Sequence, residues 1–355
     1  MTVHDPIIAG AAAQRVAIPD DAAMLRAAAE LAREYAVANP RIYWPDMLAS
    51  ALIGYGALAG AMLFDNVLLA VACGLVAMLA LYRAASFIHE LTHIRKDALP
   101  GFRLGWNLVV GIPLMIPSFL YEEVHTQHHA RTRYGTANDP EYLPLALMKP
   151  WSLPLFILVA ALAPVGLILR FGLLTPLSLL VPALRRKVVA ELSALSINPA
   201  YRRRPPEGAF RQRWAWQEAG ACLFALALVG SVFLFGWKPL LVYMAVHSAM
   251  TVINQLRTLV AHLWENEGEA MTVTAQYLDS VNVPPPSPLA AIWAPVGLRY
   301  HALHHLLPSV PYHALGKAHV RLVATLGDVS PYHQGNYTGM WPLVGKIARS
   351  TMRRR

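Results

Sequence analysis

Charged residues are scarce in this sequence. Asp, Glu, Lys and Arg together make up 14% of its 355 residues, whereas a soluble globular domain carries about 25%. Hydrophobic residues make up 56%, and they gather in long runs without charge. This combination excludes a disordered chain, a secreted disulfide scaffold and an ordinary soluble enzyme. It indicates an integral membrane protein that crosses the bilayer several times.

Cysteine is almost absent as well. Cys73 and Cys222 both lie inside apolar runs, so we expect neither a disulfide framework nor a thiolate metal site. The chain also has no glycine fingerprint for a dinucleotide and no cysteine set for an iron–sulfur cluster. A redox reaction in this protein would therefore draw its reducing equivalents from a partner protein.

Basic residues outnumber acidic ones, 30 to 21, which gives a net charge of +9. The clusters at 185–187, 202–204 and 353–355 follow or precede apolar runs. Basic residues beside membrane spans mark the cytoplasmic face and meet anionic lipid headgroups. We therefore expect membrane lipids as the partner of these clusters, and no nucleic acid.

Two hairpins account for the clearest membrane spans. Residues 48–64 and 67–85 form the first, around Asp65-Asn66, and residues 219–260 form the second, turning at Gly236. Each run approaches the ~20 residues that cross the hydrocarbon. The positions of the basic residues predict that both hairpins open to the cytoplasm.

Two segments between the hairpins are ambiguous. Pro113 and Pro117 interrupt residues 101–120, so we expect a re-entrant or interfacial piece there, and residues 151–184 make either no crossing or two. The predicted fold is an all-α membrane protein with four or six spans and a cytoplasmic cap. Its expected parts are a cytoplasmic or interfacial helical region at 1–47, a membrane domain at 48–325 and a basic tail at 326–355.

Eight of the fourteen histidines fall into three tight groups. They are His89 and His93, then His125, His128 and His129, and then His301, His304 and His305. Residues at i, i+3 and i+4 of a helix are neighbours on its surface, so each group offers several imidazoles together. All three groups follow apolar runs on the predicted cytoplasmic side, where they can converge.

Such a set predicts a metal centre. Imidazole binds iron, copper and zinc, but one tetrahedral zinc needs only three or four protein ligands. Two irons with four or five ligands each would use the whole set. His262, at the end of the predicted fourth span, is a ninth candidate, and Asn254 on the same helix face is a weaker one that would act through a water.

The order and spacing of these groups resemble those of the membrane fatty acid desaturases and their hydroxylase relatives. In that family a His-x-x-x-His box precedes a His-x-x-His-His box, and a second His-x-x-His-His box follows a transmembrane hairpin. The segment from Asn254 to His262 looks like the family's segment that carries an extra iron ligand, and the run from His301 to His313 looks like the desaturase form of the third box. The resemblance covers residues 48–325.

The resemblance implies a non-haem di-iron centre that uses O₂ on an unactivated C–H bond, with no catalytic residue beyond the metal centre. It implies an acyl substrate on a lipid, CoA or carrier protein, and an external ferredoxin-like or cytochrome-type electron donor. Glu90 and Glu122 would orient ring nitrogens of the ligands. The form of the third box favours desaturation, and hydroxylation is the alternative.

Two other classes of enzyme share parts of this pattern. His89-Glu90-x-x-His93 also spells the zinc protease motif, in which Glu90 would be the general base. Glu90 and Glu122, each three residues before a histidine, fit a carboxylate di-iron bundle. Both alternatives leave the third histidine box without a role. A haem protein is a further alternative, but His247 is the only histidine well inside a predicted span.

Overall fold

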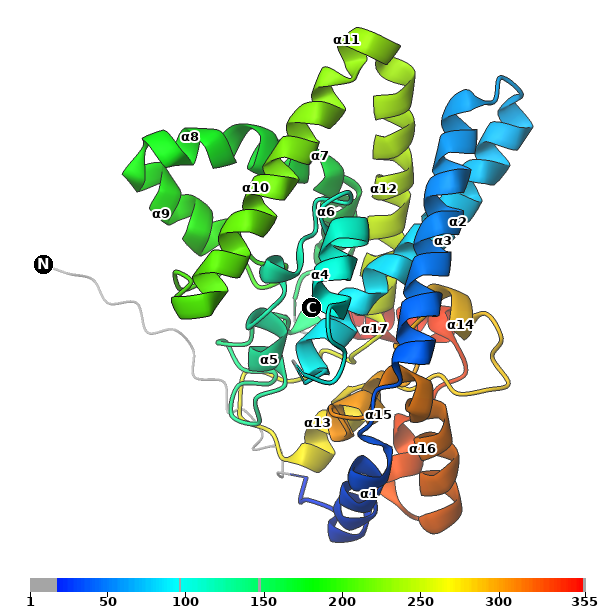
Figure 1. The fold of residues 1–355 in the computed structure, drawn as a ribbon. Helices are drawn as coiled ribbons and strands as arrows, with labels where there is room; N and C mark the ends of the chain where they lie inside the picture. The colour runs from blue at the N-terminus through cyan, green and yellow to red at the C-terminus, as the bar shows by residue number, and fades with distance from the viewer. Residues whose placement is uncertain (1–17, 96, 146–147, 354–355) are drawn as a thin grey trace, which may run out of the picture.

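The chain folds as an all-helical protein, as the sequence predicts. A computed structural model describes residues 18–95, 97–145 and 148–353 (Figure 1), and within these ranges the extended pairing is limited to isolated bridges such as that between His262 and Ser280. Four stretches of the described residues are long and apolar enough to cross a membrane. They are Pro40–Leu63, Val67–His93, Ala163–Leu180 and Gly208–Phe235.

The first hairpin consists of α2 (Pro40–Leu63) and α3 (Val67–His93). Asn66 in the turn accepts hydrogen bonds from the first backbone N–H groups of α3 and so caps that helix. Both helices are longer than the expected spans. Because α3 continues to His93, the first histidine box is built on the end of a membrane helix.

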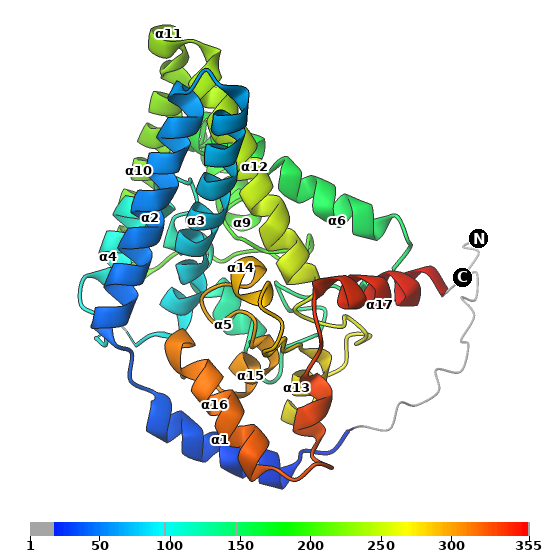
Figure 2. The same ribbon diagram turned by 90° about the vertical axis from the view of Figure 1, so that its right-hand side faces the viewer.

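The second hairpin consists of α10 (Gly208–Gly230), α11 (Val232–Phe235) and α12 (Trp237–Leu259). Its turn is at Gly236, as predicted, where the backbone φ of 72° favours glycine. The two hairpins rise on the same side of the molecule (Figure 2), and α12 packs against α3. Polar residues such as His247 and Asn254 make α12 less apolar than the four stretches above.

The proline-rich segment after α3 does not form a long helix. Its elements are α4 (Phe102–Trp106), the π-helical turn η1 (Asn107–Gly111) and the 3-10 turn η2 (Ser118–Leu120). The Asn107 side chain accepts a hydrogen bond from the backbone N–H of Ser118 at 2.8 Å and closes the bend. This agrees with the expectation that residues 101–120 are not a full span.

The second ambiguous segment is a chain of short helices. They are α6 (Ser152–Ala161), α7 (Ala163–Ile168), η4 (Leu169–Leu174), α8 (Thr175–Leu180) and α9 (Pro182–Glu191). Arg170 is 5% exposed and lies 2.6 Å from Glu218 of α10. Since an unpaired buried charge is costly, this ion pair fixes η4 against the second hairpin.

A cap of short helices lies at the open ends of the hairpins (Figure 2). It contains α1 (Ala22–Tyr35), α5 (Val124–His128), α13 (Val273–Asp279), α14 (Ala290–Trp293), α15 (His301–Leu306), α16 (Tyr312–Thr325), η5 (Pro331–Gly335) and α17 (Met340–Arg353). The apolar face of α1, with Met24, Ala28 and Leu31, is buried in one cluster with Leu303 and Leu322 of the cap. Protein therefore covers the apolar face of this helix, for which the sequence left a cytoplasmic and an interfacial position open.

Candidate metal centre

The nine histidines that the sequence singled out converge at the junction of hairpins and cap. They form two groups, and within each group the potential ligand atoms lie within 4.8 Å of one another. The first contains His89, His93, His125, His129 and His304, and the second contains His128, His262, His301 and His305. Each group has enough donors to hold one metal ion. Two ions, rather than one, therefore fit the set.

The second and third histidine boxes are divided between the two groups. In α5, His125 and the following His129 face one group while His128 faces the other, and in α15 His304 is separated from His301 and His305. Residues i and i+4 differ by about 40° around a helix axis, whereas i+3 and i+4 differ by about 100°. A single short helix can thus supply ligands to two neighbouring ions.

The Nε2 atoms point at one another inside each group. Nε2 of His129 lies 3.0 Å from Nε2 of His125, and Nε2 of His301 lies 3.0 Å from Nε2 of His262. When Nδ1 of a neutral imidazole carries the proton, Nε2 of the same ring presents a lone pair. Lone pairs that converge on one point repel each other unless a cation lies among them. This donor set fits a metal ion better than a network of protein hydrogen bonds.

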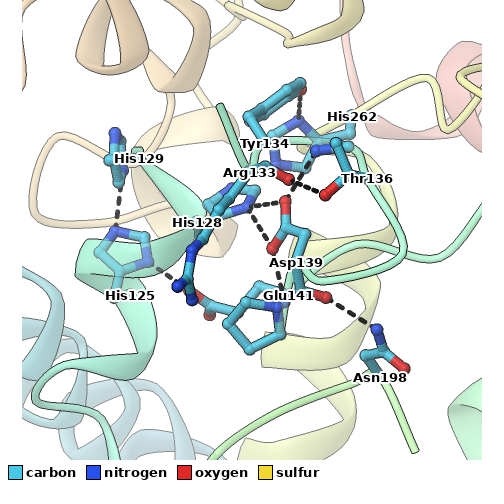
Figure 3. Close-up of polar contacts among 12 residues, drawn as sticks. His125, His128, His129, Arg133, Tyr134, Thr136, Asp139, Glu141, Asn198 and His262 are labelled. Atoms are coloured by element: carbon cyan, nitrogen blue, oxygen red, sulfur yellow. Dashed lines mark hydrogen bonds and ion pairs between the residues drawn. The ribbon is translucent and has the colours of Figure 1, made fainter. Parts of the chain in front are cut away.

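Carboxylates fix the tautomers of two histidines on α5 (Figure 3). Nδ1 of His128 lies 2.9 Å from Oδ2 of Asp139, and Nδ1 of His125 lies 2.5 Å from Oε2 of Glu141. Each Nδ1–H donates to a carboxylate, so each Nε2 is left free for a metal. Such partners orient metal ligands and raise their basicity.

Hydrogen bonds with Tyr134 and Ser280 orient His262, which lies outside any helix. Its Nδ1 is 2.8 Å from the hydroxyl of Tyr134, and that hydroxyl donates to Oδ2 of Asp279 at 2.8 Å. The Ser280 hydroxyl lies 3.2 Å from the same Nδ1. His262 therefore donates from Nδ1 and turns Nε2 toward the second group.

Burial sets the protonation of this site. It lowers the pKa of His125, His129 and His262 well below the usual range, which keeps these rings neutral. Burial also acts to lower the pKa of His128, but Asp139 outweighs it and raises that pKa. Burial raises the pKa of Glu141 to about 7. A bound cation would act in the opposite direction on that carboxyl and favour its ionised form.

Glu90 and Glu122, which we expected to orient the histidine rings, make their hydrogen bonds and ion pairs with other residues. Glu122 lies 2.8 Å from Nη1 of Arg103 and also accepts from Ser118. Glu90 accepts hydrogen bonds from the Tyr43 hydroxyl and from the Tyr312 backbone. Its nearest approach to a ligand candidate is 3.8 Å, from Oε1 to Nδ1 of His89, which is beyond hydrogen-bond distance.

Asn254 accepts a hydrogen bond from Arg257 at 3.2 Å. Sequence reasoning missed Asp139 and Glu141, although both follow the second box closely. Their Asp-Pro-Glu spacing was the available signal, because the Asp139 carboxylate accepts from the Gly135 and Glu141 backbone and builds a tight turn.

The four other described histidines lie outside both groups. His319 is bonded to the Tyr332 hydroxyl, His313 to the Asn39 backbone and His333 to the Gly327 carbonyl. His247 is buried within α12. His4 lies outside the described residues.

Comparison with known proteins adds two findings. The profile of the family described as fatty acid desaturase matches residues 65–336. A protein named ceramide hydroxylase, from Caulobacter vibrioides (strain NA1000 / CB15N), is 48% identical over 332 residues, which cover 93% of this chain and 94% of that relative. Both matches include all three histidine boxes.

Proposed function

The chain belongs to the fatty acid desaturase family, and on that premise we propose that it is an O₂-dependent di-iron hydroxylase of a ceramide-type membrane lipid. The observation that carries this proposal is the pair of histidine groups at the ends of the membrane helices. The relative named ceramide hydroxylase supports the reaction and the substrate class. Since its similarity extends over nearly the whole of both chains, it includes the membrane helices as well as the histidines.

All nine histidines are ligands in this proposal. Five would hold one iron and four the other, and Asp139, Glu141 and the Tyr134–Asp279 pair would orient the rings. Zinc has no redox chemistry, whereas iron with O₂ supplies the oxidant that an unactivated C–H bond requires. The hydrogen bonds that Glu90 accepts from Tyr43 and Tyr312 give that carboxylate a structural role, unlike the free base of a zinc protease.

Hydroxylation replaces desaturation as the favoured outcome. The third histidine box favoured desaturation, but the 48% identical relative carries the name of a hydroxylase. In hydroxylation, C–H, O₂, two electrons and two protons give C–OH and one water. In desaturation the same inputs remove two hydrogens and give two waters. Both reactions therefore need the same external electron donor.

The proposed site faces the cytoplasm and receives its electrons there. Arg186, Lys187, Arg202 and Arg204 are exposed, and basic residues of this kind beside spans mark the cytoplasmic side. An acidic ferredoxin-like or cytochrome-type donor would be attracted to this surface. A lipid substrate would reach the histidines from the bilayer, because α3 carries the first box at the end of a membrane helix.

Expression in a host without such enzymes tests the proposal. We expect ceramides with one added oxygen in the lipid extract, and two irons per chain in the purified protein. His128→Ala and His304→Ala should abolish the product, whereas His333→Ala, outside both groups, should not. A histidine-dependent new double bond would restore the desaturase assignment. Unchanged lipids from iron-loaded protein, supplied with ceramide, O₂ and a reductant, would refute the function.

A further inference from the structure

Arg257 is a cation beside the histidine groups, in the last turn of α12. Its positive charge is close enough to lower the pKa of His262 and His301, after burial as the main cause. One terminal nitrogen donates to Asn254 at 3.2 Å. Its Nε is buried and has no hydrogen-bond partner, and none of the ion pairs found among the described residues includes Arg257.

A guanidinium in this position is costly unless something compensates it. Partial burial removes water from the charge, and two metal cations nearby would add repulsion. The carboxylates of the site are already engaged, Glu141 with His125 and Asp279 with Tyr134. The Tyr82 hydroxyl also lies close enough to Arg257 to interact with it. The Nε–H nevertheless has no acceptor among the described residues, and an oxygen of a molecule that enters the site would supply one.

We propose that Arg257 binds an oxygen of the substrate lipid's polar part, an amide carbonyl or a hydroxyl, and so places the reacting carbon close to that part. This inference rests on the proposed function. A ceramide has an amide and hydroxyls at the junction of its two chains, and these groups lose their water when they approach the site. The Nε–H of Arg257 replaces one of those lost hydrogen bonds.

The position of Arg257 limits which carbon can react. Arg257 lies in the last turn of α12, and His262 follows the end of that helix, Leu259, by three residues. A lipid oxygen held by Arg257 and a carbon at the histidine groups are therefore separated by few bonds. The added oxygen should lie near the amide or hydroxyl group rather than in the middle of an acyl chain. A reaction in the middle of an acyl chain would need only apolar contacts beside the histidine groups.

Substitution of Arg257 separates substrate binding from metal binding. Arg257→Gln removes the charge and the Nε–H, and Arg257→Lys retains the charge alone. Arg95→Gln is the matched control, because Arg95 is exposed, pairs with Asp97 at 3.0 Å, and also lies near a histidine box. The readouts are iron per chain, the ceramide-dependent rise in Tm of oxidised protein without reductant, steady-state kinetics, and the position of the new oxygen by tandem mass spectrometry.

We expect Arg257→Gln to keep its iron, to lose the ceramide-dependent rise in Tm, and to raise KM at least about 10-fold with a smaller change in kcat, as loss of one bond to a charged donor predicts. Arg257→Lys should be intermediate and Arg95→Gln unchanged. A wild-type rise in Tm in Arg257→Gln, or iron lost from both Arg257 variants, would overturn the role of Arg257. A wild-type product oxidised in the middle of a chain would overturn it as well. Wild-type protein that forms no oxygenated lipid would instead refute the proposed function.

Discussion

The two histidine groups are held in different ways. In the five-histidine group, His89 and His93 belong to α3, a long membrane helix, and neither ring nitrogen of His89 has a hydrogen-bond partner among the described residues. In the four-histidine group, His262 lies beyond the end of α12, and Tyr134 and Ser280 bond to its Nδ1. A rigid helix orients its side chains by itself, whereas an irregular segment needs hydrogen bonds to do so.

The groups are nevertheless linked. Both take ligands from α5 and α15, because His128 and His304 face away from their box neighbours. The rings of His129 and His305, which belong to different groups, stack at 4.2 Å between centroids. Any movement of α5 or α15 therefore affects both groups, and the difference between them lies in the third element, α3 or the segment at His262.

The largest effect should come from removing one ligand from each group. Loss of a residue that only hydrogen-bonds to a metal ligand lowers activity about 10–100-fold. We expect His128→Ala and His304→Ala, which remove a ligand itself, to lower activity by more than that. Iron analysis of each variant measures the coupling between the groups. One iron retained would mean that the sites fill independently. Loss of both would mean that α5 and α15 join them into one unit.

Next in size should be the loss of a carboxylate behind α5. Asp139→Asn leaves His128 without its anionic partner, so we expect iron affinity or activity to fall about 10–100-fold. Glu141→Gln should act on the other group through His125. Glu191→Gln, on an exposed residue, is the control. Equal iron binding in Asp139→Asn and in the control would contradict an orienting role for Asp139.

A smaller loss should follow from Tyr134→Phe, because Ser280 remains near His262. We expect the iron affinity of the four-histidine group alone to fall about 10-fold, the lower end of the range for loss of a residue that hydrogen-bonds to a metal ligand. Titration of the stripped protein with Fe²⁺ would show one weakened site and one unchanged. If both sites weakened equally, the proposed difference between the groups would be wrong.

Acid should destabilise the metal-free protein through both groups at once. Burial lowers the folded-state pKa of six ligand candidates, His125, His129, His262, His301, His304 and His305, well below the usual 6.5. Their contribution is present above pH 6.5 and is lost as the pH falls toward the folded-state values, by up to about 1.4 kcal/mol per histidine and pH unit. Tm of stripped protein should therefore fall between pH 7.5 and pH 5.5, and a Tm that rises instead would contradict burial of these rings.

Local patterns explain how much was predictable from the sequence. Run length and turn residues located the first hairpin at Asp65-Asn66 and the second at Gly236. The i, i+3 and i+4 spacing found eight of the histidines in the two groups, and a position at the end of a span found His262. Each of these signals depends on neighbouring residues, which a single sequence displays directly.

The partners of the histidines required contacts between distant segments. Tyr134 reaches His262 and Asp279 across 128 and 145 positions of the chain. Glu90 and Glu122, which precede histidines by three residues, bond instead to Tyr43 and Arg103, from other helices. Proximity along the chain did not reveal these contacts, because tertiary packing decides which side chain each carboxylate meets.

By itself, the sequence determined that this is an all-helical membrane protein with nine histidines able to bind metal, because apolar run length and helical spacing are local properties. Only the tertiary structure decided that these histidines divide five and four, and that α5 and α15 each serve both groups. The physical reason is the angular offset of neighbouring residues on a helix. It lets one box face two directions, and the packing of α3 and His262 on either side selects which histidine joins which group.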